Sequence, residues 1–414
     1  MSGPRVAAKS ALVLPIIVIR ADIVIIGGGV IGSSIALHLR QRLANARVVV
    51  VERDPTYARA SSRLATGGIR QQYCSPLNVA MARHSVDFLA RFDDMTAATK
   101  RPTHAWFRQR GYLFLANAAN APHLQRRFEL ERASGAAVEQ WTRARLRDKV
   151  PGLVTDDIEL AIFGPEDGYL DPREVLAGMR ALAAHAGAEF IDGKVISVER
   201  ERGQVTGVRV ATGDTEHLIN TRVVVNAAGA WAATIAAAAG VEVPVTAVRQ
   251  HLFRLELDEP LPSRIPMIFD PDGTHWRLDD PRMPGDHEML VIGRSREDEP
   301  PGENFEVDPA RLHSEMLPTL QRRYPAAQVR SVAEAWAGLY EMTPDRNGII
   351  GEHPELPGFI VAAGFSGHGL MLSPATGLAV AELVADGRCT TFDITPLAAD
   401  RFRRGALFLD DALI

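Results

Sequence analysis

The sequence predicts a mixed α/β fold in which one unit of parallel strands and helices carries a second, strand-rich unit as an insertion. Three observations predict this class. Near the start, the β-branched run Ile23–Ile26 leads through closely spaced glycines into a helical pattern. Residues 244–294 are rich in strand patterns and turn residues, and residues 358–387 repeat the opening order of strand, glycine loop and helix. At 414 residues, the chain is long enough for roughly two or three domains.

The opening unit has the arrangement of a dinucleotide-binding turn. Gly27, Gly29 and Gly32 have the GxGxxG spacing, with Val30 and Ile31 in between. Glycines at these positions turn the chain sharply, let the backbone approach a pyrophosphate and pack the helix against the strand. The N-terminus of the following helix then meets the phosphates with unpaired N–H groups and a partial positive charge.

The glycine spacing alone also occurs in ordinary loops, so the next strand decides between the two interpretations. Residues 48–51 are four valines, and Glu52 follows them about twenty residues beyond the glycine turn. A carboxylate at this place accepts hydrogen bonds from ribose hydroxyls. The strand and the acid together predict a Rossmann-like, dinucleotide-binding domain.

The composition excludes several classes of protein. A net charge of −5 gives no basic field for nucleic acid, so we expect no nucleic-acid partner. Cys74 and Cys389 are the only cysteines, which excludes a disulfide framework and a cysteine-based zinc cluster. We predict no metal site and a cytoplasmic location. Residues 11–19 are apolar but too short to span a bilayer, so we interpret residues 1–20 as an N-terminal extension and do not favour membrane association.

Other elements follow from local patterns. Asp171 is expected to cap a helix that has Pro172 in its first turn and ends at Gly187. Residues 106–116 alternate and turn at Gly111, which predicts a β-hairpin, and residues 189–200 predict one strand. Residues 124–146 are charged with helical spacing, which is typical of a solvated face.

Polar groups gather in two further stretches. Residues 58–75 combine small, hydroxyl-bearing and glycine residues with Arg70, which predicts a ligand loop. The alternative is a surface loop with a solvated arginine. His275 and Arg277 stand among several cations of the strand-rich region, and one face of that sheet would suit an anionic substrate. Taken singly, each of these residues is better interpreted as facing solvent.

A second glycine loop lies near the end of the chain. An apolar strand runs into Gly364, Gly367 and Gly369, and a long helix follows that Gly387 can terminate. Such a loop at a helix N-terminus can stabilise negative charge on the N1 and C2 carbonyl region of a flavin ring that accepts a hydride.

Together these stretches resemble the glycine and D-amino acid oxidase-like (DAO) family of FAD-dependent amine oxidoreductases. They are most similar to sarcosine, dimethylglycine and proline dehydrogenases and to FAD-dependent oxidoreductase domain-containing proteins. The resemblance implies an FAD-binding domain formed by residues 21–95, 150–235 and 335–390, a substrate domain formed by residues 96–149 and 236–334, and a C-terminal tail at 391–414. The matching segments, in family order from residue 21 to 402, are IIGGGVIGSSIALHL, VVVVERD, ASSRLATGGIRQQY, DGYLDP, VVVNAAGAW, GLYEMTPDRNGIIG, GFSGHGL and DITPLAADRF.

The resemblance also implies which residues bind FAD. The first glycine turn takes the pyrophosphate, the acid after the second strand takes the ribose, and the loop before Gly68 wraps the flavin side. Val195 holds the adenine, and the glycine loop near the end of the chain approaches the isoalloxazine ring. The implied set is Gly27, Gly29, Val30, Ile31, Gly32, Glu52, Arg53, Ser61, Ser62, Arg63, Ala65, Thr66, Gly67, Gly68, Val195, Ala228, Gly229, Trp231, Gly338, Gly364, Gly367, His368, Gly369 and Leu370.

Departures from the family pattern indicate non-covalent FAD. In monomeric sarcosine oxidases, the cysteine bonded to flavin lies two residues before a tyrosine, and here Gly338 takes that place before Tyr340. Dimethylglycine dehydrogenases attach the flavin to a histidine in the loop after the ribose-binding acid, but no histidine lies between Glu52 and Gly68.

The resemblance assigns roles in catalysis as well. Arg70 matches an arginine that grips the substrate carboxylate, and Arg277 is a candidate substitute for a second anchor, a lysine replaced here by Met371. Tyr340 would orient the carboxylate or the amine, and His368 would hydrogen-bond the reduced flavin. The alternatives are a packed aromatic ring and a helix-cap histidine.

The electron acceptor follows from a missing charge. Oxidases of the family place a lysine over the flavin, whereas no lysine follows Lys194 in this chain. We therefore favour a dehydrogenase that uses a quinone or an electron-transfer protein over an oxidase that uses oxygen. His275 or Arg277 would be the substitute cation if oxygen were the acceptor.

The expected reaction is hydride transfer to flavin N5 from the carbon beside the amine of a secondary, N-methyl or D-amino acid. The alternative is a flavin-bearing assembly or electron-transfer partner without small-molecule turnover. Binding of NAD(P) instead of FAD is a third hypothesis, in which the second glycine loop has no role.

Overall fold

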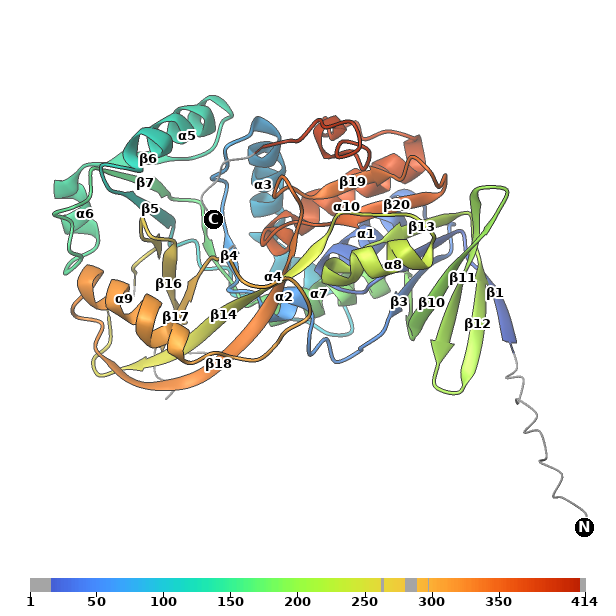
Figure 1. The fold of residues 1–414 in the computed structure, drawn as a ribbon, viewed down its shortest axis with the longest axis horizontal. Helices are drawn as coiled ribbons and strands as arrows, with labels where there is room; N and C mark the ends of the chain where they lie inside the picture. Colours follow the sequence, from blue (N-terminus) through green and yellow to red (C-terminus); the bar gives the residue numbers. More distant parts are fainter. Residues whose placement is uncertain (1–15, 262–263, 280–288, 297, 410–414) are drawn as a thin grey trace, which may run out of the picture.

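The structure is a computed structural model that describes residues 16–261, 264–279, 289–296 and 298–409. Over these residues the chain forms a six-stranded and an eight-stranded sheet, with a four-stranded and a two-stranded sheet beside them. Figure 1 shows helices α1 (Val30–Arg42), α3 (Pro76–Leu89) and α10 (Gly369–Asp386) at the six-stranded sheet, and α9 (Leu317–Arg323) beside the eight-stranded one. The mixed α/β class predicted from the sequence is confirmed.

The six-stranded sheet has the order β19-β20-β13-β2-β3-β9. All neighbours pair in parallel except β19, which is antiparallel to β20. Alternate residues of β2 and β3 pack into two different cores, because helices cover one face and the four-stranded sheet lies on the other. The strands are β2 (Ile23–Ile26), β3 (Val48–Glu52), β9 (Glu189–Asp192), β13 (Val223–Asn226), β19 (Ile349–Glu352) and β20 (Phe359–Ala363).

Helices α1, α10 and α7 (Pro172–His185) pack together on the first of these faces. The Asp171 side chain caps α7 by accepting from the backbone N–H groups of Arg173 and Glu174, as predicted. Helix α10 ends at Gly387, which has a left-handed φ of +72°. Among the described residues, α10 is the helix long and apolar enough to cross a membrane, and two thirds of it is buried inside the protein as a core helix would be.

The other face carries the four-stranded sheet, in the order β1-β12-β11-β10, and helix α8 (Ala232–Ala238). Residues 16–20, the end of the predicted N-terminal extension, form β1 and pair in parallel with β12. The strands are β1 (Ile16–Arg20), β10 (Lys194–Glu201), β11 (Gln204–Thr212) and β12 (Thr215–Asn220). The two-stranded sheet joins β4 (Gly68–Ile69) to β8 (Gly168–Tyr169).

The eight-stranded sheet has the order β18-β14-β17-β16-β15-β5-β7-β6. One face packs on α9 and on η2 (Leu312–Met316) around the fully buried Trp276. The strands are β5 (Tyr112–Ala116), β6 (Glu139–Trp141), β7 (Leu160–Gly164), β14 (Thr246–Leu257), β15 (Met267–Phe269), β16 (Thr274–Asp279), β17 (Met289–Arg294) and β18 (Val329–Met342). The remaining short helices are α2 (Ser61–Leu64), α4 (Phe92–Ala97), α5 (Ala121–Ala133), α6 (Arg143–Lys149), η1 (Gly229–Trp231) and η3 (Thr395–Leu397).

Two strand predictions were wrong. Residues 106–116 form no hairpin, because β5 begins after Gly111 and pairs with β7 and β15 rather than with the residues before it. The strand predicted over residues 189–200 divides at Gly193, and its halves β9 and β10 join different sheets.

The prediction of a solvated face over residues 124–146 was also wrong in part. This region contains α5, β6 and the start of α6 rather than one helix. Arg127 and Glu131 on α5 form a buried ion pair at 2.7 Å. The Arg127 guanidinium also lies 3.9 Å from the centre of the Phe114 ring, so this side of α5 faces the eight-stranded sheet.

Candidate functional site

A long cleft crosses the carboxyl ends of β3, β2 and β13 and continues to β18 and the start of α10. Its wall includes Gly27 after β2, Glu52 at the end of β3 and Ala228 after β13. Gly367 and Gly369, from the second glycine loop, also belong to the wall. The crevice outside the carboxyl ends of parallel strands is where open α/β sheets bind ligands. Two glycine loops from opposite ends of the sequence therefore meet on one binding cleft.

Most of the predicted cofactor residues line this cleft, and so do two of the predicted catalytic residues, Tyr340 and His275. The predicted site residues that do not line the cleft are Gly32, Arg63, Gly67, Gly68, Arg70, Arg277, Gly364 and His368. The lining residues from the predicted cofactor set are Gly27, Gly29, Val30, Ile31, Glu52, Arg53, Ser61, Ser62, Ala65, Thr66, Val195, Ala228, Gly229, Trp231, Gly338, Gly367, Gly369 and Leu370.

The glycines of the first turn have separate roles. Gly27 has a φ of +99°, and a Cβ there would lie 2.5 Å from the carbonyl oxygen of Ala227. A Cβ on Gly32 would lie 1.9 Å from the carbonyl oxygen of Gly27, so this glycine allows α1 to pack on the turn. At Gly29, by contrast, the nearest atom to a Cβ is Ser62 Oγ at 3.6 Å. The position of Gly29 thus leaves room on the cleft side, whereas Gly27 and Gly32 shape the turn.

Three other glycines that were predicted to bind the cofactor do not line the cleft and instead pack against other parts of the protein. A Cβ on Gly67 would lie 2.1 Å from the carbonyl oxygen of Leu170, and one on Gly68 would lie 2.2 Å from the hydroxyl of Tyr112. Gly364 has a φ of +81°, and a Cβ there would lie 2.4 Å from a methyl carbon of Thr343. These glycines allow close packing of protein against protein.

Glu52 stands at the end of β3, half-buried at the cleft. Its two carboxyl oxygens accept hydrogen bonds from the backbone N–H groups of Gly28 and Asp54, both at 2.8 Å. Burial raises the pKa of Glu52, and these two hydrogen bonds oppose the shift. The backbone therefore fixes this carboxyl group at the edge where ribose binding was predicted.

The far end of the cleft is shaped by Tyr340 and the second glycine loop. A Cβ on Gly367, which has a φ of +95°, would lie 2.7 Å from the Tyr340 ring, so the glycine lets the ring pack against the loop. Burial raises the pKa of Tyr340, which keeps its phenol protonated as a hydrogen-bond donor. Helix α10 begins behind this loop without a side-chain cap.

Two cleft-lining nitrogens indicate that the cleft suits a polar ligand. Trp231 Nε1 and His251 Nε2 are buried and have no hydrogen-bond partner within the described part of the chain. The Trp231 ring is held in place by the Arg53 guanidinium, which stacks 3.7 Å from its centre. Buried polar nitrogens of this kind are normally paired, so both are available to a ligand in the cleft.

Arg70 lies behind the far end of the cleft and is 1% exposed. Its Nη1 donates to the carbonyl oxygen of Gln72 at 2.5 Å, and its Nη2 lies 2.8 Å from His368 Nε2. Because a guanidinium can only donate, Nε2 accepts and His368 is neutral. Burial and the Arg70 charge lower the pKa of His368 to about 3, which agrees with this assignment.

Within the described part of the chain, Arg70 has no carboxylate partner. Among the described residues none forms an ion pair with it, and its Nε has no hydrogen-bond partner. Asp167 interacts with Arg70 only at longer range, since its two carboxyl oxygens accept from Gln71 N at 2.9 Å and Gln72 Nε2 at 3.0 Å. Burial raises the pKa of Asp167 to about 7. Among the described residues, this buried guanidinium therefore has two hydrogen-bond partners for its five N–H groups, and its Nε has none.

The other predicted cations differ in what they can do. Arg277 is occupied inside the protein, because it donates to the carbonyl oxygens of Thr66 at 2.7 Å and Leu278 at 2.9 Å and pairs with Asp279 at 3.2 Å. His275 lines the cleft, but burial lowers its pKa to about 4, so it is neutral at physiological pH.

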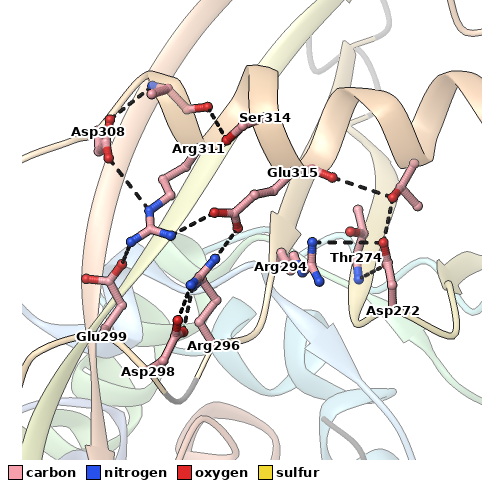
Figure 2. A network of polar contacts seen from close by, with 12 residues as sticks. Asp272, Thr274, Arg294, Arg296, Asp298, Glu299, Asp308, Arg311, Ser314 and Glu315 are labelled. Carbon is pink, nitrogen blue, oxygen red and sulfur yellow. Dashed lines mark hydrogen bonds and ion pairs between the residues drawn. The ribbon is translucent and has the colours of Figure 1, made fainter.

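Arg294 also borders the cleft, but its side chain points toward the helix side of the sheet. Its Nη1 lies 4.0 Å from Asp272, beside Thr274 (Figure 2). Figure 2 shows that the neighbouring segment is tied to η2 by a network of ion pairs. That network joins Arg296, Asp298, Glu299, Asp308, Arg311 and Glu315.

Sequence reasoning missed several lining residues, of which Glu341 and His251 bear chemistry. Glu341 is next to Tyr340 in the quoted segment GLYEMTPD, and a charged residue near the end of a mostly apolar strand was the available signal. His251 is one of several cations in the strand-rich region, and no local pattern distinguishes it from the others. Other missed lining residues include Asp54, Arg59, Lys194, Thr234 and Gln250.

A comparison with family models matches residues 22–383 to the family described as FAD dependent oxidoreductase (DAO). The chain belongs to this family. It is FAD-dependent, so FAD is the ligand that the two glycine loops and the buried nitrogens of the cleft are suited to hold. The first turn would hold the pyrophosphate, Glu52 the ribose and the second glycine loop the ring.

Curated relatives agree with this placement. The chain is 34% identical to FAD-dependent oxidoreductase domain-containing protein 1 of Bos taurus, over 93% of this chain and 85% of the relative. It is 28% identical to mitochondrial sarcosine dehydrogenase of Mus musculus, over 89% of this chain but 40% of that longer protein.

Solved structures show the same fold. The chain matches L-proline dehydrogenase from P. horikoshii with a TM-score of 0.84 at 29% identity, covering 94% of this chain and all of that one. It matches glycine oxidase from Geobacillus kaustophilus with a TM-score of 0.79 at 27% identity, covering 92% and 99% of the two chains. The predicted resemblance to amine oxidoreductases of the DAO family and the predicted cofactor FAD are thus confirmed.

Proposed function

We propose that this chain oxidises the carbon–nitrogen bond of an amino-acid-like amine. The substrate class is a secondary or N-methyl amino acid of the sarcosine type, or a D-amino acid. FAD, when bound, supplies the acceptor for the two electrons and the hydrogen that leave the substrate carbon. The protein supplies binding, orientation and a protected site.

The observation that carries this proposal is the buried Arg70 guanidinium, which has no carboxylate partner among the described residues. A buried cation without an anion is costly, and proteins rarely retain one unless a ligand supplies the missing charge. A carboxylate matches the planar, two-pronged geometry of a guanidinium. An amino acid bound through its carboxylate to Arg70 would sit beside Tyr340 and His368, at the far end of the cleft.

Neighbouring side chains would orient the bound amine. The Tyr340 phenol is a protonated donor, and the neutral His275, whose Nδ1 donates to the carbonyl oxygen of Gly273 at 3.2 Å, can accept a hydrogen bond at Nε2 without adding charge. The rings of Phe269 and His275 stack with centres 4.6 Å apart, and Phe114 stacks on Phe269 at 4.8 Å. Of these rings only His275 lines the cleft, so the two phenylalanines would hold the His275 ring in place from behind.

We propose that the enzyme is a dehydrogenase rather than an oxidase, and the charges at the same site support this proposal. No lysine follows Lys194 in the sequence, His275 is neutral and Arg277 is held in internal hydrogen bonds. The lysine charge that would favour electron transfer to oxygen is therefore absent from these positions, and the Arg277 charge is offset by Asp279 at 3.2 Å. A quinone or an electron-transfer protein is the proposed acceptor, and the cytoplasm is the proposed location.

One finding supports a second candidate. Four curated relatives at 32–34% identity carry the name FAD-dependent oxidoreductase domain-containing protein 1 or its homolog, which states no substrate. The alternative function is an FAD-bearing assembly or electron-transfer partner that turns over no free amine.

A dye-coupled assay separates the two functions. FAD-loaded protein is offered a panel of secondary, N-methyl and D-amino acids with an artificial electron acceptor. Turnover of at least one amine supports the proposed enzyme. If no member of the panel is turned over while a protein partner is captured specifically, the second function holds.

A further inference from the structure

Glu341 is a buried carboxyl group on the cleft wall that the proposed chemistry does not use. It is the last but one residue of β18, is 8% exposed and lines the cleft. Its Oε2 accepts a hydrogen bond from the backbone N–H of Gly364 at 2.9 Å. Its own carbonyl oxygen accepts from Ser366 N at 3.1 Å. Both the side chain and the backbone of Glu341 therefore hold the second glycine loop.

The carboxyl group lies between glycines of two segments. A Cβ on Gly369, the first residue of α10, would lie 3.3 Å from Oε1, and a Cβ on Gly229 would lie 3.7 Å from Oε2. Gly229 follows β13, and Gly364 follows β20. The sheet order β20-β13-β2-β3 places Glu341 on the side of the first glycine turn opposite to Glu52. With the ribose at β3 and the pyrophosphate at β2, this side is the flavin half of the cofactor.

Few charges surround Glu341. On β14, the residue opposite Glu341 is Ala247. The titratable residues at the next alternate positions of β14 are Arg249 and His251. Arg249 pairs with Glu299, and burial lowers the pKa of His251. On α10, the preceding His368 is neutral. On η1, Trp231 carries the stacked guanidinium of Arg53.

From this geometry we infer that Glu341 is a proton-uptake site coupled to the redox state of FAD: it is ionised beside the oxidised cofactor and takes up a proton from solvent when the cofactor is reduced. The two electrons come from the amine during turnover or from an electrode in a titration, and the proton neutralises the carboxylate. The inference requires FAD binding but no amine substrate, so it stands independently of the proposed function.

The physical reason is electrostatic. Reduction adds negative charge to the flavin half of the cleft, where a second buried anion is unfavourable because the low dielectric does not screen it. Burial already raises the pKa of Glu341 to about 7, against the opposing hydrogen bonds from Gly364 and Phe365. Added negative charge nearby shifts this equilibrium further toward the protonated acid.

The test is the pH dependence of the FAD midpoint potential, measured by spectroelectrochemical titration of the FAD-loaded protein over the two pH units above that pKa, where the carboxylate is ionised beside the oxidised cofactor. If one proton accompanies the two electrons, the reduction equilibrium changes tenfold per pH unit, which is about 30 mV for a two-electron couple. A second proton on Glu341 makes the change 100-fold, or about 59 mV per pH unit.

We expect a slope steeper than the one-proton value in the wild type and the one-proton value in Glu341→Gln, which keeps the size and polarity of the side chain. The matched control is Glu334→Gln, because Glu334 lies on the same strand outside the cleft and pairs with Arg254. It should keep the wild-type slope. A one-proton slope in the wild type overturns the inference even if Glu341→Gln fails to fold. Equal, steep slopes in the wild type and Glu341→Gln also overturn it.

Discussion

Replacing Arg70 by methionine removes the guanidinium while roughly keeping the volume of the side chain. Over the residues that the structure describes, the wild-type group has a carbonyl oxygen and a neutral histidine as hydrogen-bond partners and no carboxylate. We therefore expect the folded protein to lose little or no thermal stability, because an uncompensated buried charge is removed together with its hydrogen bonds. Loss of function should appear instead in substrate binding.

The magnitude follows from the bonds that a substrate carboxylate would make. Two hydrogen bonds to a charged group are each worth about 1.5–3 kcal/mol, so their joint loss costs at least about 3 kcal/mol. Since 1.4 kcal/mol corresponds to a factor of ten, kcat/KM should fall by roughly 100-fold or more. Most of this loss should appear in KM for amino acid substrates.

The assay is dye-coupled turnover of the best amino acid of the panel, with thermal unfolding and FAD content as checks on folding. Arg91→Met is the matched control, because Arg91 is exposed near the end of α3. A decarboxylated analogue of the substrate should react equally slowly with the wild type and with Arg70→Met. If Arg70→Met retained wild-type kcat/KM, or if both substrates lost the same factor, Arg70 would not be the carboxylate anchor.

Four further outcomes test the account. Gly32→Ala places a Cβ 1.9 Å from a backbone oxygen and should lower the thermal stability strongly, whereas Gly29→Ala, with its nearest contact at 3.6 Å, should fold normally yet retain less FAD on gel filtration. Arg401→Met strands the buried Asp345 carboxylate and should cost about 3–5 kcal/mol in urea unfolding, against about 0–1 kcal/mol for Arg404→Met at an exposed pair. Acid precipitation should release all FAD into the supernatant, and yellow colour kept in the washed pellet would show a covalent bond. Oxygen consumption during amine turnover should be much slower than dye reduction, and equal rates would favour an oxidase.

Local patterns predicted the parts of the fold that local chemistry determines. The glycine turn at Gly27, the Asp171 cap and the Gly387 terminus all depend on residues within a few positions of each other. The strand, glycine and helix pattern near the end of the chain also identified the second glycine loop, and the structure places it on the same cleft as the first.

Predictions failed where the partner lies far along the chain. The residues after Gly111 have a strand pattern. This pattern does not indicate whether β5 pairs with the residues just before Gly111 or, as observed, with β7 and β15. The chain passes from the six-stranded sheet to the four-stranded sheet at the single residue Gly193. A single sequence carries no signal for either pairing.

The same limit applies to side chains in the site. Arg70 and Arg277 are equally charged in the sequence, and only the fold shows that Arg277 is occupied by backbone oxygens and Asp279 while Arg70 has an unpaired N–H. Glu341 acquires its environment from Gly364 and Gly369, which arrive from the other side of the cleft. The burial and the charge environment of a side chain depend on the assembled fold, so sequence patterns could not show which of these charged residues have partners inside the protein.

The central claim is that FAD and an amino-acid-like amine share this cleft, and the most direct measurement is anaerobic reduction of the bound FAD by the amine. FAD-loaded protein is mixed without oxygen with secondary, N-methyl and D-amino acids, and absorbance is followed at about 450 nm, where oxidised flavin absorbs. The account predicts that at least one of these amines bleaches the band and that its decarboxylated analogue does so far more slowly. An unchanged band with every amine, in protein that an artificial reductant bleaches fully, would contradict it.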